Sequence, residues 1–237
     1  MKVAMLRIGI DTGSGGMHGP LFHDGSFDYI PIPDGSGVDE RTYGNTTGVK
    51  ERKLITYFPE SRRVAMASQS IHFDPEFVTF TYGDPTPPKA GLRHLEKGDM
   101  LIFYCGLEGW DARSEPALYL MGFFEVLAAG KADDFRRREM HRLFKKNFHV
   151  RHQRVFERQR PELVLVKGSE RSRLLKKAVC ISVLGRDRRG RPLKVLSPKM
   201  QRIFGSFNGR LSFQRSPTRW VDPADAIRAV EFMRSLT

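Results

Sequence analysis

Three residues in the first third of the chain carry side chains that could act as an acid or a base. Asp11 and His18 flank a glycine-rich segment, and Asp74 follows His72 by two residues and directly precedes Pro75. A carboxylate or an imidazole next to a substrate can transfer a proton in the transition state. Asp11, His18 and Asp74 are therefore the candidate catalytic residues, although the sequence does not establish that the protein is an enzyme.

The segment 11–19 follows a short apolar run and is rich in glycine. Glycine allows the backbone amides of a loop to converge on a ligand such as a phosphate or a base edge. A tight, irregular turn without a ligand explains the same residues equally well. The predicted ligand contacts of this loop are Thr12, Gly13, Ser14, Gly15, Gly16 and His18.

The loop also contains Asp-Thr-Gly-Ser, which resembles the motif of aspartic proteases, where paired carboxylates share a proton and activate water. Residues 183–187 resemble a later element of those enzymes, two apolar residues followed by glycine. The two segments lie too far apart for a small retroviral-type subunit, and no second Asp-Thr-Gly supports a two-lobed enzyme. An aspartic-protease-like hydrolase is therefore a minor alternative.

A basic turn at 167–173 is the second candidate phosphate site. It lies between a predicted strand and residues 174–177, so its amides could begin a helix, and a helix N-terminus attracts anions. Basic and hydroxyl side chains add charge and hydrogen-bond donors. A solvated basic turn is the alternative. The predicted phosphate contacts are Lys167, Gly168, Ser169, Arg171, Ser172 and Arg173.

Positive charge dominates the chain of 237 residues. Lysine and arginine total 40 against 27 aspartate and glutamate residues, which gives a formal net charge of +13. Such an excess attracts polyanions and costs self-repulsion, so nucleic acid, DNA or RNA, or a nucleotide is the expected partner. An anionic membrane surface and a phosphorylated small substrate are the alternatives. The sequence does not indicate an oligomeric state.

Much of this charge lies in a predicted amphipathic helix from 132 to about 152 and in the stretch that follows it. Its basic groups would contact phosphates in a salt-sensitive way and read no base sequence. Histidines 141, 149 and 152 have no acidic residue nearby at metal-ligand spacing, so neither a metal nor a cofactor is predicted. The basic runs are 136–138, 145–146, 151–160 and 186–191.

Cysteine content and hydropathy favour the cytoplasm. Cys105 and Cys180 lie far apart and form no Cys-x-x-Cys pair, which fits a reducing compartment. The longest mostly apolar stretch, 117–130, is shorter than the roughly 20 residues that cross a bilayer. No membrane partner and no secretory signal are expected.

Alternating and apolar runs predict an α+β fold, with one domain over 1–237 and a subdomain border that could lie near 84–88. A helix is expected to begin at Pro198 and end at Gly205, and another to begin at Pro223. Strands are expected at 3–10, 54–58, 64–67, 78–82 and 162–166, an edge or extended segment at 27–32, and antiparallel pairs at 100–104 with 118–126 and 179–184 with 193–196.

The pair at 97–104 and 118–126 resembles the Gly-Asp strand and its partner in PUA-like barrels, a superfamily that includes the EVE, ASCH and YTH domains. The resemblance implies a PUA-like mixed β-barrel decorated by helices. Many such domains hold a modified or flipped base in a pocket between barrel and helix, where aromatic rings stack on it. The stacking candidates are Tyr82, Tyr104 and Trp110, with Phe103 and Tyr119 as further aromatic residues of these strands.

Motifs along most of the chain also resemble the third nucleotide modification associated domain family. They are the glycine-rich opening, 72–75, 81–84 and 167–169. This resemblance implies a nucleotide-modification context without a particular reaction. The expected function is a binding module for a nucleic acid with an unusual base, or for a free nucleotide. An enzyme that installs or removes a base modification and a nonspecific nucleic-acid binder are the alternatives.

Overall fold

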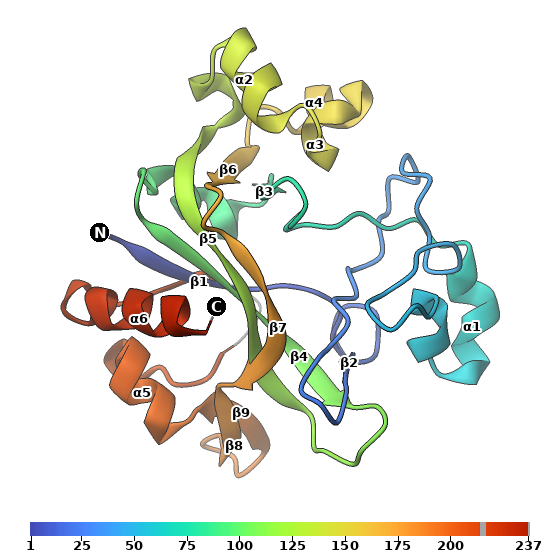
Figure 1. Ribbon diagram of the computed structural model, residues 1–237, viewed down its shortest axis with the longest axis vertical. Coiled ribbons are helices and arrows are strands. Elements are labelled where there is room, and N and C mark those ends of the chain that lie inside the picture. Colours follow the sequence, from blue (N-terminus) through green and yellow to red (C-terminus); the bar gives the residue numbers. More distant parts are fainter. Residues whose placement is uncertain (214–216, 237) are drawn as a thin grey trace.

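A large mixed sheet forms the centre of the computed structural model, which describes residues 1–213 and 217–236 (Figure 1). Strands β1 and β2 run parallel to β4, and the other strand pairs of this sheet are antiparallel. The main path has the order β10 (Arg219–Trp220), β1 (Val3–Arg7), β4 (Met100–Gly109), β5 (Ala117–Lys131), β6 (Val164–Gly168) and β3 (Thr81–Asp84). Off this path, β2 (Gly19–Leu21) pairs with β4, and β7 (Arg173–Cys180) pairs with β5.

The sheet is open over the residues that the structure describes. Its path ends at β10 on one side and at β3 on the other, and β8 (Ser182–Arg186) and β9 (Pro192–Leu196) form a separate hairpin. The expected mixture of helices with a mixed sheet is confirmed. The expected PUA-like barrel is not confirmed, because the described strands do not close on themselves.

The predicted hairpin of β4 and β5 is confirmed and forms the middle of the sheet. Its ladder joins Met100 to Glu125 and Leu107 to Ala117, with a shift of register after Phe103. Both strands are buried on both faces along most of their length. Nearly continuous apolar runs are therefore required here, because neither face meets water.

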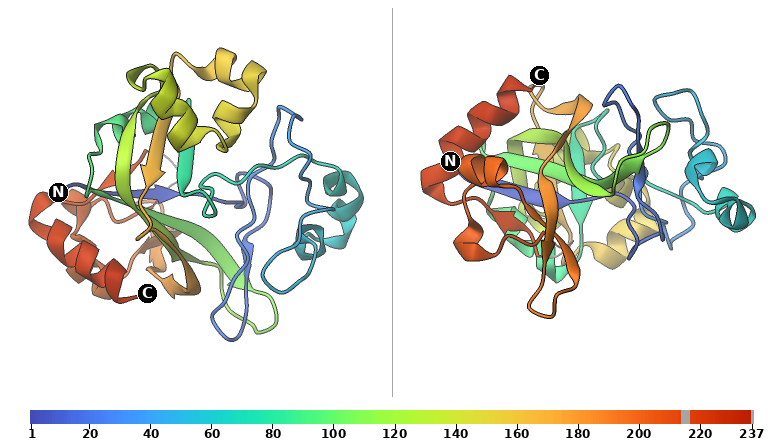
Figure 2. Two further views of the ribbon diagram at one scale, coloured as in Figure 1. Left: turned by 45° about the horizontal axis from the view of Figure 1, so that its top comes forward. Right: turned by 90° about the horizontal axis from the view of Figure 1, so that it is seen from below.

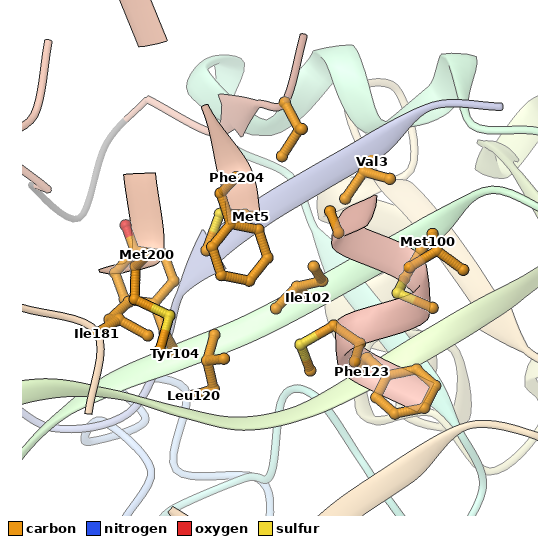
Figure 3. Close-up of a cluster of buried hydrophobic side chains, with 14 of the residues drawn as sticks. Val3, Met5, Met100, Ile102, Tyr104, Leu120, Phe123, Ile181, Met200 and Phe204 are labelled. Atoms are coloured by element: carbon orange, nitrogen blue, oxygen red, sulfur yellow. The ribbon is translucent and has the colours of Figure 1, made fainter. Parts of the chain in front are cut away.

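Helices α5 (Pro198–Phe204) and α6 (Pro223–Ser235) cover one face of the sheet. Figure 3 shows Met5 and Ile102 of the sheet beside Phe204 of α5. The predicted helix starts are confirmed, since the Ser197 and Asp222 side chains accept hydrogen bonds from the Met200 and Ala224 amides at 3.3 and 2.9 Å. These caps satisfy amides that lack a partner within the helix.

The opposite face carries an aromatic core under the 3-10 helix η2 (Pro87–His94). The Phe103 ring centroid lies 4.8 Å from that of Phe124 and 6.1 Å from that of Tyr82. The segment 84–88, where a subdomain border could lie, joins β3 to η2, and both elements contact β6. This core packs beneath β3, a strand that also forms one wall of a cavity.

A lobe at one side of the sheet contains the 3-10 helix η1 (Leu54–Tyr57) and α1 (Glu60–Ala67), visible in Figures 1 and 2. The strands predicted at 54–58 and 64–67 are therefore wrong. Pro59 directly precedes α1, and Val64 is 91% exposed, so the apolar residues of 64–67 do not form a buried strand. Short apolar runs do not distinguish a strand from a helix by periodicity alone.

A second lobe, at the end of the sheet near β6, holds the basic tract (Figure 1). The helix predicted from 132 to about 152 is broken, because the Asn147 side chain accepts a hydrogen bond from the His149 amide at 3.0 Å and caps a new helix. Such capping competes with continuation of the preceding helix. The lobe consists of η3 (Ala132–Asp134), α2 (Arg137–Phe144), α3 (Phe148–Arg151) and α4 (Gln153–Gln159).

In three further segments the structure differs from the prediction or changes the predicted boundaries. The helix expected to follow the 167–173 turn is strand β7, which hydrogen bonds to β5, so that turn has no helix N-terminus. The strand expected at 78–82 is β3, which begins after Phe80, a residue with φ of 49°. The segment 27–32 belongs to no strand, but Phe27 forms an isolated bridge with Leu21 and the Ile30 carbonyl oxygen accepts a hydrogen bond from the Ile10 amide at 2.8 Å. Among the described residues, no helix has the length and apolar character that crossing a membrane requires.

Candidate functional site

A cavity of about 430 Å³ lies between β3, α3 and the end of β1. We call it the His149 pocket. Its volume falls in the range of roughly 300–1,000 Å³ typical of small-ligand sites. The segments around Tyr29 and His72 complete its wall, and Ile32 is 39% exposed. Its polar and aromatic lining includes Tyr29, His72, Asp74, Tyr82, Lys89 and His149.

Asp74 and His149 form a buried pair in this pocket. The Asp74 Oδ2 atom lies 3.4 Å from His149 Nε2, and its Oδ1 atom accepts a hydrogen bond from the Gly83 amide at 2.9 Å. Burial raises the pKa of Asp74 to about 6. Burial opposes the charged form of His149, but the hydrogen bond and negative charge of Asp74, the hydrogen bond to Gln159 and the charge of Asp84 together outweigh burial and raise the pKa of His149. The pair can therefore hold a proton that it shares.

His72 stands beside this pair. Its ring stacks on Phe148 with centroids 3.8 Å apart, and its centroid lies 5.4 Å from that of His149. Burial and the neighbouring His149 lower the pKa of His72 to about 4, so the ring is neutral near pH 7. One ligand atom from each of His72, Asp74 and His149 lies within 4.8 Å of the others. Within the described part of the chain, these three residues therefore form a group that could hold a metal ion.

Sequence reasoning named Asp74 as an acid–base candidate but missed its partners. Asp74 and His149 are 75 positions apart, so no local spacing connects them. The absence of an acidic residue near His149 in the sequence therefore did not exclude a carboxylate partner in space. The one available signal was the short interval between His72 and Asp74 in a motif that the family resemblance already included.

Tyr82 is the stacking candidate that the fold places in the His149 pocket. Its hydroxyl donates a hydrogen bond to Asp84 Oδ2 at 2.9 Å, and burial raises the pKa of Tyr82. Tyr104 is fully buried beneath Phe213, far from solvent. Trp110 is 39% exposed and packs edge-on against Tyr57. Phe103 and Tyr119 belong to the buried aromatic core.

In the glycine-rich loop, the Asp11 side chain binds two of the loop's own backbone amides. The Asp11 Oδ1 atom accepts hydrogen bonds from the Gly13 and Ser14 amides at 2.9 and 2.8 Å, and Oδ2 lies 3.3 Å from Arg7. A Cβ atom on Gly15 would lie 2.2 Å from Ile10, so glycine is needed for close packing. These contacts favour the tight turn over a phosphate loop. Thr12 and Gly16 are exposed, and Ser14 is half-buried.

His18, the last candidate of that loop, lies between two charged groups. Its Nε2 atom lies 2.9 Å from Lys194 Nζ, and its Nδ1 atom lies 3.4 Å from Glu108. Burial, Lys194 and Arg7 together outweigh Glu108, so the pKa of His18 is lowered. The neutral ring can accept a hydrogen bond from Lys194 while Nδ1 faces Glu108. Asp74 lines the His149 pocket and His18 does not, so these two acid–base candidates belong to different places in the fold.

We expect His18 to make part of the stability of the protein pH-dependent. Its pKa is lower in the folded chain than in the unfolded chain, where it is about 6.5. The free energy of unfolding should therefore fall as the pH decreases below about 6.5, because the unfolded chain binds the proton first. Urea unfolding midpoints should drop less between about pH 7.5 and about pH 5.5 in His18→Gln than in the parent protein. An equal drop would contradict this, and His141→Gln, on the exposed side of α2, is the control.

The turn at 167–173 also uses its polar groups within the protein. Lys167 Nζ donates a hydrogen bond to the Thr79 carbonyl oxygen, and Ser172 Oγ accepts one from the Glu125 amide at 3.2 Å. A cavity of about 300 Å³ beside Arg171 contains the Glu125 carboxylate, which pairs with Arg171 and Arg234 and so occupies part of the positive charge there. Of the other predicted contacts, Ser169 accepts from the Arg171 amide, Gly168 ends β6, and Arg173 donates to the Ser172 carbonyl. None of the residues around this cavity belongs to the glycine-rich loop, so the two predicted phosphate segments do not share it.

Asp11 of the Asp-Thr-Gly-Ser motif, and Asp187 at the end of the segment that resembles the later apolar-apolar-glycine element, both accept hydrogen bonds within their own turns. Asp187 Oδ1 accepts hydrogen bonds from the Arg189 and Arg191 amides at 2.8 and 2.9 Å in the β8–β9 hairpin. Asp11 accepts from the loop that follows it, as described above. The contacts of neither carboxylate include the other.

A larger cavity of about 860 Å³ lies on the second lobe, and we call it the basic groove. Among the described residues that line it there is no aspartate or glutamate. Val150 and Arg151 of α3 face this groove, and the preceding His149 faces the His149 pocket. Helix α3 therefore separates the two cavities. The basic residues of the groove are Arg137, His141, Lys145, Lys146, Arg151 and Arg160.

The comparisons with known proteins identify one family. The model of nucleotide modification associated domain 3 matches residues 2–234, which include every residue of the His149 pocket and the basic groove. No curated protein and no solved structure matches the chain. Because the match covers nearly the whole sequence, the chain belongs to the nucleotide modification associated domain 3 family.

Proposed function

We propose that this protein binds a nucleic acid and inserts one modified base into the His149 pocket. The observation that carries the proposal is the placement of the two cavities on either side of α3. A base in the His149 pocket would leave its strand within reach of the basic groove. Membership of a family named for nucleotide modification supports a modified base as the ligand.

The chemistry of the His149 pocket suits a nucleobase. Its aromatic wall, Tyr29 and Tyr82, offers apolar contact to a planar ring. Asp74, Lys89 and His149 are largely buried polar groups that could pair with the donors and acceptors on a base edge. Proteins that take a base out of its stack read it by such hydrogen bonds and by aromatic contact.

The basic groove suits the phosphates of the same strand. Its lysine and arginine side chains come from helices α2 and α3 and from the residues that directly follow α2 and α4, and Phe135, Met140 and Phe156 line the groove between them. Cations attract the backbone without regard to sequence, whereas apolar side chains allow bases to rest against the protein. In this proposal the basic groove provides the affinity for the strand, and the His149 pocket provides the selectivity for the modified base.

Ile32→Glu tests this function at the mouth of the His149 pocket. Ile32 is exposed, so the variant should fold, and the new carboxylate should repel an entering nucleotide. We expect about tenfold weaker binding, because one inserted base contributes on the order of 1–3 kcal/mol. Fluorescence anisotropy would use single-stranded DNA and RNA with one methylated or hydroxymethylated cytosine, beside the unmodified strand.

Val64→Glu is the matched control, because it makes the same chemical change on exposed α1, away from the pocket. If both variants lost the same binding affinity, the change in net charge would explain the loss, and this result would contradict insertion of a base. Loss of the preference for the modified strand in Ile32→Glu alone would support it.

A second candidate function is an enzyme that changes the inserted base. The observation that favours it is the buried Asp74–His149 pair at 3.4 Å, which could move a proton to or from a bound base. Mass spectrometry of nucleosides recovered from the bound strand distinguishes the two functions. An altered base mass favours the enzyme, and an unchanged mass with selective binding favours the binding module.

A further inference from the structure

Three side chains in the wall of the His149 pocket have the composition of a metal site. His72 and Asp74 come from the segment between α1 and β3, and His149 comes from α3. One ligand atom from each lies within 4.8 Å of the other two. Because the three ligand atoms lie this close together, a single ion could contact all three residues.

The hydrogen bonds of His149 orient its Nε2 atom toward Asp74. Its Nδ1 atom lies 2.6 Å from Gln159 Oε1, and an amide oxygen can only accept a hydrogen bond. Nδ1 must therefore carry the hydrogen. Nε2 lies 3.4 Å from Asp74 Oδ2, so an ion between the two residues would take the place of the proton that they share and would bind to the lone pair of Nε2. Histidine ligands of metals are commonly oriented in this way by a partner on the second ring nitrogen.

His72 provides an independent indication. Its Nδ1 atom is buried and has no hydrogen-bond partner among the described residues, and the nearest carboxylate oxygen, on Asp34, is 3.8 Å away. Buried polar atoms without a partner are uncommon and require an explanation. Stacking on Phe148 also holds the His72 ring in place. The His72 side chain therefore loses less conformational entropy when it binds an ion.

We propose that His72, Asp74 and His149 bind one divalent transition-metal ion, such as Zn²⁺, at the wall of the His149 pocket. Two imidazoles and one carboxylate suit ions of intermediate softness better than Mg²⁺ or Ca²⁺, which prefer oxygen ligands alone. Three protein ligands leave a coordination position for a water molecule or a pocket ligand. The ion would also connect the segment 72–74 to α3.

Titration calorimetry with Zn²⁺ on the untagged, chelator-treated full chain tests the proposal. We expect one Zn²⁺ per chain in the parent protein and loss of that site in Asp74→Asn and in His149→Ala. Asp74→Asn keeps an oxygen that can accept from the Gly83 amide, so it should remain folded, which circular dichroism would check. Co²⁺, read by its visible absorption, would report whether nitrogen ligands surround the ion.

Two further variants distinguish a built site from surface binding. Gln159→Leu removes the acceptor from His149 Nδ1 and should weaken Zn²⁺ binding about 10- to 100-fold, the usual effect of losing such a partner. His94→Ala removes an exposed histidine outside the pocket and should leave binding unchanged.

Unchanged Zn²⁺ affinity in folded Asp74→Asn and His149→Ala would mean an adventitious ion only and would overturn the proposal. So would absence of a stoichiometric site in the parent protein. Neither result bears on nucleic-acid binding, because the assay contains Zn²⁺ alone, so the proposed function stands or falls separately.

Discussion

Replacing Lys145 and Lys146 together with glutamine is expected to lower the affinity for single-stranded DNA on the order of tenfold near 0.1 M salt. Both side chains are exposed and line the basic groove. Each phosphate that they neutralise releases counterions, and for single strands this contributes about 0.7 to the slope of log K against log salt concentration. The double variant should therefore reduce that slope by about 1.4.

The matched control is Lys97→Gln with Lys199→Gln. It removes the same charge from two exposed lysines that do not line the basic groove. Anisotropy titrations over a series of salt concentrations measure both slopes. If the control lost as much affinity as Lys145→Gln with Lys146→Gln, the positive charge would act as a diffuse field and the groove would not be the binding surface. Modified and unmodified strands should lose affinity in parallel, because phosphates carry no base information.

Phe103→Ala should have the largest effect on stability, lowering the free energy of unfolding by about 3–5 kcal/mol. Phe103 is fully buried at the middle of β4, and its ring meets those of Phe77, Tyr82 and Phe124 at centroid distances of 4.8 to 6.1 Å. Truncation removes the buried ring and leaves a cavity that neighbouring strands on both sides cannot collapse to fill. Urea unfolding followed by circular dichroism measures the change.

Val78→Ala is the comparison, because Val78 is 89% exposed just before β3. We expect it to alter the free energy of unfolding by no more than about 0.5 kcal/mol. A loss in Phe103→Ala of similar size would mean that the aromatic core is not the main support of the sheet. Because Phe103 also underlies Tyr82, the variant should bind modified strands more weakly even where it remains folded.

The features that the sequence determined are those with a local physical cause. Proline after Ser197 and after Asp222 sets the start of α5 and α6, since a capping side chain and a fixed φ act within one turn. The β4–β5 pair was predictable because its long apolar runs suit only strands buried on both faces. The surplus of positive charge is likewise a property of composition alone.

Short segments gave weaker signals, and tertiary contacts decided them. Residues 64–67 belong to α1, in which no residue is buried, so the apolar residues there do not mark a strand of the core. Residues 173–180 became β7 because they pair with the free edge of β5, and the predicted helix N-terminus was lost with it. The break before α3 depends on Asn147, whose side chain also donates a hydrogen bond to Thr81 on β3.

The candidate site shows most clearly the difference between what the local sequence determines and what tertiary contacts determine. The sequence alone singled out Asp74 as a titratable residue and Tyr82 as an aromatic one, and it placed a basic tract near α2. Only the tertiary structure brought His149 to within 3.4 Å of Asp74 and set the basic groove across α3 from the His149 pocket. The reason is that residue type and local pattern determine what a side chain can do, whereas long-range packing of β3, β6 and the second lobe determines what it faces.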